Sequence, residues 1–141
     1  MRFSVRPGLG VLVALSLAGC QGEPLAPGPL TLRLDVQPRV VSPADSFTVH
    51  LVIRNNGWTD TTLTSGCGLP AWFALDGPAG IVYPSPWQGC FAMVTPFRIA
   101  GRDSLTLTRR FIAAQPPGEY VVFTDWLIAG LPVLRRPLTI Q

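Results

Sequence analysis

The sequence predicts an all-β fold, a single antiparallel immunoglobulin-like β-sandwich of about seven to nine short strands. Apolar residues alternate with polar ones along its segments, as in Leu30, Leu32, Leu34 and Val36, and a period of two is typical of half-buried strands. The 15 prolines and 14 glycines punctuate the chain so often that residues 30–141 show no sustained helical period.

The predicted strands follow one another at short intervals. The first spans residues 30–36, and a turn containing Pro38, Ser42, Pro43 and Asp45 leads to the second at 47–54. Further strands are predicted at 61–64, 72–75, 81–83, 97–99, 104–112, 119–127 and 131–140. The inward-facing residues should form the core, namely Leu32, Leu34, Val49, Leu51, Ile53, Phe73, Leu105, Leu107 and Val122.

Two local patterns add detail to this fold. The motif Pro117-Gly118-Glu119-Tyr120 resembles the start of a tyrosine-corner strand, in which the hydroxyl bonds to nearby backbone; the alternative is a strand that merely begins with an aromatic residue. The pairs Arg109-Arg110 and Arg135-Arg136 should protect sheet edges, because strand neighbours point to opposite faces. An anion or lipid-headgroup site is the alternative for these pairs.

At the start of the sequence a basic segment with Arg2 and Arg6 precedes an apolar run at 9–17, which leads into Leu17-Ala18-Gly19-Cys20, a motif that looks like a lipobox. Residues 1–19 therefore resemble a bacterial lipoprotein signal peptide. The run is far shorter than the roughly 20 apolar residues that a membrane-spanning helix needs. The alternatives are an ordinary secretory peptide that happens to precede a cysteine, and a plain transmembrane anchor.

This resemblance implies cleavage before Cys20 and a diacylglyceryl group on the Cys20 thiol, which would anchor the protein to a membrane. Gln21 stands where an inner-membrane retention signal usually has aspartate. The implied location is therefore the cell envelope, on the periplasmic face of the outer membrane in a Gram-negative cell. Residues 20–29 are rich in proline and glycine and should form a flexible tether, and residues 30–141 should form the sandwich domain.

The charge of the mature chain is close to zero. Cleavage removes two of the 11 arginines, so nine remain against eight acidic residues, and the chain has no lysine. Nucleic-acid binding requires a dense cationic face, so we expect no nucleic-acid partner.

Two cysteines remain once Cys20 is assigned to lipid. In the oxidising envelope Cys67 and Cys90 are expected to form a disulfide, which would stabilise the fold by about 3 kcal/mol on the chain-entropy model. The alternative is a reactive or metal-binding thiol pair, but the sequence has no close Cys-x-x-Cys spacing and His50 is its single histidine. We expect neither a metal nor another cofactor.

The best candidate for a binding surface is residues 66–96, a long stretch rich in glycine, proline and aromatic residues. Its prolines should stiffen an extended segment, and its aromatic side chains should supply contact energy. The predicted binding loop consists of Tyr83, Pro84, Pro86 and Trp87. Trp72 and Phe91 are instead expected to fold back over the disulfide.

A series of short motifs runs through the middle of the chain, namely Val52-Ile53-Arg54-Asn55-Asn56, Thr61-Thr62-Leu63, Ser65-Gly66, Trp72-Phe73-Ala74-Leu75-Asp76, residues 99–105 and Pro117-Gly118-Glu119-Tyr120. In this order they resemble the BsuPI family, the bacterial intracellular proteinase inhibitors. The motifs cover roughly residues 48–123, and the resemblance implies a sandwich fold and proteinase inhibition. Cys67, Cys90 and residues 86–96 depart from the family pattern, and an exported location departs from its intracellular label.

Catalytic constellations are not evident in the sequence. Nucleophilic hydrolysis needs a base oriented by a third group, and the strand phase of His50 directs this sole histidine to solvent, opposite the core. The aspartates at 60, 76, 103 and 125 flank turns or strand ends, where carboxylates cap backbone groups. We therefore expect a binding protein and not an enzyme.

Two functions follow from these observations. The first is a lipid-anchored envelope module that inhibits a protease by inserting residues 83–87 into its cleft. The alternative is a non-inhibitory envelope module for interaction, assembly or adhesion, whose partner would be another envelope protein. A hydrolase that uses His50 and an aspartate is the third hypothesis.

Overall fold

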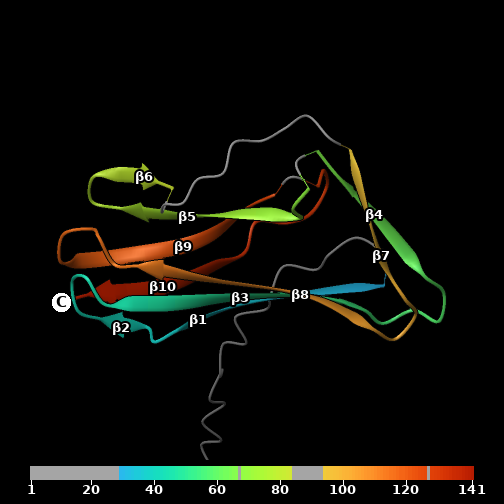
Figure 1. Ribbon diagram of the computed structural model, residues 1–141, viewed down its shortest axis with the longest axis horizontal. Helices are drawn as coiled ribbons and strands as arrows, with labels where there is room; N and C mark the ends of the chain where they lie inside the picture. The colour runs from blue at the N-terminus through green and yellow to red at the C-terminus, as the bar shows by residue number, and fades with distance from the viewer. Residues whose placement is uncertain (1–28, 67, 84–93, 127) are drawn as a thin grey trace, which may run out of the picture.

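The computed structural model describes residues 29–66, 68–83, 94–126 and 128–141, and these residues form a two-layered β-sandwich (Figure 1). One layer has the strand order β1-β3-β8 and the other β2-β10-β9-β5-β6, while β4 and β7 pair with each other. The strands are β1 Leu30–Gln37, β2 Val40–Val41, β3 Ser46–Asn55, β4 Thr61–Ser65, β5 Ala71–Gly77, β6 Gly80–Val82, β7 Thr95–Ile99, β8 Ser104–Ile112, β9 Gly118–Trp126 and β10 Arg135–Ile140. The predicted immunoglobulin-like sandwich is confirmed.

Strand β2 is the main departure from the predicted strands, because it lies within the stretch predicted as a turn. After the cis peptide bond Gln37-Pro38 the chain leaves the sheet of β1, and Val41 pairs in parallel with Ile140 in the other sheet. All other strand pairs are antiparallel. The first two strands therefore belong to different layers, β1 to the three-stranded sheet and β2 to the five-stranded sheet.

The last strand begins later than predicted, at Arg135 instead of residue 131. The preceding residues are used for turn contacts: the indole of Trp126 donates to the carbonyl of Pro132 at 2.6 Å, and the amide of Leu134 donates to the hydroxyl of Thr124 at 2.9 Å. These bonds occupy the carbonyl of Pro132 and the amide of Leu134, which a longer β10 would need for pairing with a neighbouring strand.

The core lies between the two layers, where alternate residues of β1 and β3 face β5, β9 and β10. The ring centres of Phe47 on β3 and Phe111 on β8 lie 5.6 Å apart. The Phe111 ring also packs edge-on against Phe73 of β5 in the opposite layer. Seven of the predicted core residues are buried, namely Leu32, Leu34, Val49, Leu51, Ile53, Phe73 and Val122. Leu105 and Leu107 are only half-buried, because β8 is the edge strand of its sheet.

The tyrosine corner is confirmed. The hydroxyl of Tyr120, on β9, donates a hydrogen bond to the carbonyl oxygen of Pro116 at 2.8 Å. Its ring packs directly against Gly77, where an added Cβ would lie 2.3 Å from the ring. Tyr120 therefore joins the start of β9 to the end of β5.

We expect Tyr120→Phe to lower the free energy of unfolding by about 1–2 kcal/mol, because the partly buried Pro116 carbonyl loses its donor. Urea denaturation measures this change. The matched control is Tyr83→Phe, whose hydroxyl is on the surface and whose loss should cost no more than about 0.5 kcal/mol. Equal losses of unfolding free energy for the two variants would show that the Tyr120 hydrogen bond contributes no more than a surface hydrogen bond.

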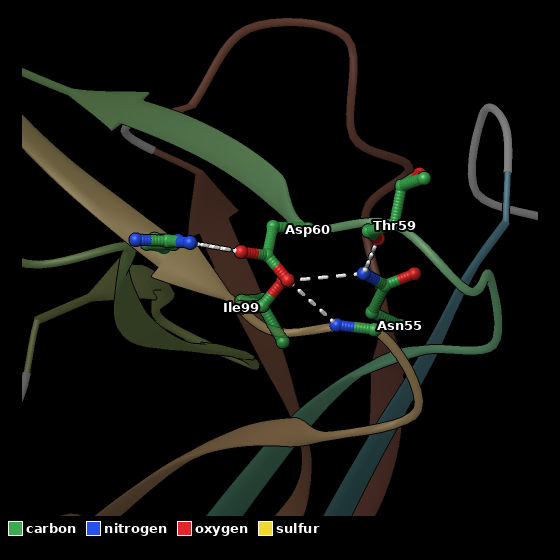
Figure 2. Close-up of polar contacts among 6 residues, drawn as sticks. Asn55, Thr59, Asp60 and Ile99 are labelled. Carbon is green, nitrogen blue, oxygen red and sulfur yellow. Dashed lines mark hydrogen bonds and ion pairs between the residues drawn. The ribbon is translucent and has the colours of Figure 1, made fainter.

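A buried asparagine organises the end of the sandwich where β4 and β7 rise away from the layers (Figures 1 and 2). The side chain of Asn55 is fully buried and donates to the carbonyls of Thr59 at 2.8 Å and Ile99 at 3.2 Å. Its own oxygen accepts from the amide of Gly57 at 2.9 Å. One side chain thus ties the end of β3 to both the β3–β4 turn and β7.

Asp60 stabilises the same end of the sandwich through hydrogen bonds at the surface. One of its oxygens accepts from Arg98, at 2.7 Å from Nε, and the other from the amide of Gly101 at 3.1 Å (Figure 2). The hydrogen bond from Arg98 is the main reason that the pKa of Asp60 is lowered. We refer to residues 55–60 with residues 98–103 as the corner.

Candidate binding surface

Tyr83 directly follows β6 and lies on the outer face of the five-stranded sheet. Its hydroxyl donates to a carboxylate oxygen of Asp125, on β9, at 2.7 Å, and 42% of the residue remains exposed. The hydrogen bond spans β5, which lies between β6 and β9. Tyr83 is therefore fixed at its tip while its ring stays accessible.

The other predicted loop residues, Pro84, Pro86 and Trp87, lie outside the described residues, as do Cys20, Cys67 and Cys90. Their roles as binding loop, lipidation site and disulfide stay predictions. The described chain resumes at Val94, whose side chain is largely exposed, and enters β7 at Thr95. Residues 84–93 thus link the end of β6, the edge strand of the five-stranded sheet, to the start of β7, where Thr95 pairs with Ser65.

An apolar strip extends from Tyr83 across the outer face. Ala74 on β5 and Phe123 on β9 are register partners, and both are buried although they point away from the core. Trp72 is the register partner of Asp125 and is half-buried on the same face. The expectation that Trp72 folds back onto the protein agrees with its half-burial, while its packing on the cysteines lies outside the described residues.

Arg135 borders the strip on the side of β10. Its guanidinium lies 5.3 Å from the centre of the Phe123 ring and 3.5 Å from a carboxylate oxygen of Asp76. Arg135 is the register partner of Phe123, so the strand pairing itself places the cation over the ring. The outer face thus presents the exposed part of Tyr83 together with Arg135, and aromatic residues and arginine are enriched at protein interfaces.

Sequence reasoning missed Phe123, Asp125 and Arg135, because they come from strands distant in the chain from residues 66–96. A signal was present in the run Val121-Val122-Phe123, whose consecutive apolar residues indicate a strand covered on both faces. The arginine pairs were placed correctly at edges. Arg109 and Arg110 are exposed on the edge strand β8, and Arg135-Arg136 lie beyond the two residues of β10 that pair with β2.

Deprotonation of Tyr83 should be shifted to high pH. The hydrogen bond to Asp125, together with partial burial and the negative carboxylate, raises the pKa of Tyr83 above its usual value. A raised pKa in the folded state means that the contact stabilises the fold below the unfolded pKa of Tyr83 and that this contribution disappears as pH rises through the folded pKa.

We expect Asp125→Ala to move the tyrosinate absorbance transition of Tyr83 to lower pH, measured as the difference from the matching Tyr83→Phe variant. The control is Asp76→Ala, which removes a carboxylate from the same face without touching Tyr83. An unchanged midpoint in Asp125→Ala would contradict the contact.

His50 lies where the strand phase placed it, on the outer face of the three-stranded sheet and half-buried. Its Nδ1 is 3.1 Å from the hydroxyl of Thr108, and its register partner on the other side is Asp35. The oxygens of Asp35 are engaged by Gln37 and by the amide of Val36. Within the described parts of the chain, no cluster of metal-ligating residues and no helix that could span a membrane occurs.

Comparisons with known proteins identify the fold. No protein-family profile matches the chain, and a search of curated proteins found no match. Among solved structures, the Pseudomonas fluorescens alkylpurine DNA glycosylase AlkC, bound to DNA with an abasic site analogue, matches with a TM-score of 0.53 at 12% identity. A β-glucosidase from Erythrobacter marinus, EmGH1, matches with a TM-score of 0.51 at 8% identity.

These matches cover about four-fifths of the chain but only a small part of the larger proteins. The aligned region spans 80% of this chain and 30% of the glycosylase, and 79% of this chain and 15% of the β-glucosidase. A Pyrococcus furiosus CARDB domain with di-metal ions matches at a TM-score of 0.44, 14% identity and 91% of its length. At these identities the likeness concerns the sandwich fold alone.

Proposed function

We propose that the chain is a lipid-anchored binding module of the bacterial cell envelope, and that it inhibits a protease with the segment that begins at Tyr83. The lipobox-like motif that ends in Cys20 supports the anchor, and Gln21 supports an outer-membrane address. The likeness of residues 48–123 to the BsuPI inhibitors supports the activity, and the sandwich fold is compatible with it.

The observation that carries the proposal is the anchoring of Tyr83. Its hydrogen bond to Asp125 fixes the first residue of a proline-rich segment to the central part of a sheet, while much of the ring stays exposed. The far end of the segment is held by the pairing of Thr95 with Ser65. Fixed ends lower the entropy that a loop loses on binding, and this favours both affinity and resistance to cleavage.

The test uses the mature full-length protein and a panel of trypsin-like, chymotrypsin-like and subtilisin-like proteases. We expect slow, tight inhibition of at least one protease, and Tyr83→Ala should weaken it at least about tenfold, since an aromatic anchor commonly contributes more than 1 kcal/mol. Ile112→Ser is the matched control, because it removes an exposed apolar side chain from the other sheet. Failure to inhibit any protease, or rapid cleavage within residues 83–94, would exclude the proposed activity.

The second candidate is a non-inhibitory envelope module for interaction, assembly or adhesion. The exposed side chains of Ile81, Tyr83 and Arg135 on the outer sheet face favour it, because a broad sheet face suits a protein partner better than it suits a protease cleft. Arg135→Glu should abolish capture of such a partner from envelope extracts and leave protease inhibition unchanged. Loss of inhibition with intact capture would instead favour the first candidate.

A further inference from the structure

Trp58 is displayed to solvent by a turn that is otherwise tightly held. It is 83% exposed, more than any other large apolar residue in the described part of the chain. The amide of Arg102 donates to the carbonyl of Gly57 at 2.9 Å, and an added Cβ at Gly101 would lie 2.2 Å from the carbonyl oxygen of Trp58. The side chain of Asn55 also accepts from the amide of Gly57, so the backbone on both sides of Trp58 is held in place.

A cation accompanies the indole. The guanidinium carbon of Arg102 lies 4.1 Å from the centre of the Trp58 ring, and Arg54, on the neighbouring β3, is also exposed. Neither arginine forms an ion pair with a described residue. The two acids at this end are already engaged, since Asp60 binds Arg98 and Asp103 accepts from the amide of Ser104.

The same turn receives the chain that comes from Cys20. The amide of Asn56 donates to the carbonyl of Pro29 at 2.8 Å, and the ring of Pro29 packs against Gly57. Pro29 is nine positions after Cys20 in the sequence, and even a fully extended chain of that length spans only about 30 Å. If lipid is attached at Cys20, the corner is the end of the sandwich closest to the bilayer.

We propose that Trp58 and Arg102 dock this corner on the surface of a phospholipid bilayer, an inference that rests on the proposed lipid anchor. Indole rings favour the membrane interface, where the apolar body meets acyl chains and the N–H meets polar groups. The guanidinium of Arg102 would pair with a lipid phosphate while it stays stacked on the ring. The β5–β6 turn, at the opposite end of the sandwich in Figure 1, then projects away from the bilayer.

The test uses the mature lipidated protein, purified from membranes and reconstituted in vesicles of phosphatidylethanolamine and phosphatidylglycerol. Part of the phospholipid carries bromine in its acyl chains, and the measured quantity is quenching of tryptophan fluorescence. We expect quenching in the unaltered protein and its loss in Trp58→Phe. Trp72→Phe is the control, because it removes a half-buried indole from the outer sheet face and should leave the quenching in place.

Arg102→Gln provides a second arm of the experiment. The variant keeps Trp58 but removes the cation, so we expect weaker bromolipid quenching and a larger response to iodide in the aqueous phase. Quenching that persists unchanged in Trp58→Phe overturns the inference. Full access of iodide to Trp58 in the vesicles also overturns it, and would mean that the corner faces water or a protein partner absent from the vesicles.

Failure of the anchor and failure of the docking are distinguishable in this design. The mass of the purified protein is measured before reconstitution, and a mass without lipid on Cys20 removes the proposed anchor together with the inference. A lipidated protein with a water-exposed Trp58 removes only the docking.

Discussion

Replacing Asn55 with leucine should lower the free energy of unfolding by about 3 kcal/mol or more, the sum expected for several backbone groups left without partners. The leucine side chain has a similar size, so the loss reflects polar contacts and not a cavity. The carbonyls of Thr59 and Ile99 and the amide of Gly57 would each lose a hydrogen bond in a site that is closed to water. Urea denaturation of the full-length protein measures the change.

The neighbouring Asn56 offers a matched control. Its side chain donates to the hydroxyl of Thr31 at the surface, where water can replace the bond. Asn56→Ala should therefore cost no more than about 1 kcal/mol. Equal losses for the two variants would contradict the organising role assigned to Asn55. A functional consequence follows as well, since loosening this turn should also release the display of Trp58.

Replacing Phe47 with alanine should have a similarly large effect, a loss of about 3–5 kcal/mol. Phe47 is 1% exposed and packs against Phe111, its register partner, so that truncation leaves a cavity between the two layers. Thermal and urea unfolding both report this loss.

Ile112→Ala is the control for Phe47→Ala. Ile112 follows Phe111 on the same edge strand but points outward and is largely exposed, so its truncation should fall within about 0.5 kcal/mol of the unaltered protein. A comparable effect from both variants would mean that the core does not lie where the two layers meet.

The alternation of apolar and polar residues was sufficient to predict the long strands. In β1 and β3 every inward residue except Asn55 is apolar, and the predicted core positions there are buried. In β8 the same alternation overestimated burial, because Leu105 and Leu107 lie on an edge strand that the second layer covers incompletely. Sequence periodicity defines which face points inward, but not how far the opposite sheet extends.

Contacts between distant segments were not predictable in the same way. Strand β2 has only two residues, and it forms through pairing with the end of β10, where Ile140 is the partner of Val41. Asn55 reads as the end of a strand next to a glycine turn, and its burial depends on Ile99, which is 44 residues further along the chain. The bond between Tyr83 and Asp125 likewise depends on the sheet order β6-β5-β9.

The measurement that tests the proposed lipid anchor most directly is the mass of the mature N-terminal peptide, taken from protein isolated with its membranes. We predict a peptide that begins at Cys20 and carries a diacylglyceryl group on its sulfur, with or without an acyl chain on the freed amine. A peptide that retains residues 1–19, or one that begins at an unmodified Cys20, would contradict it.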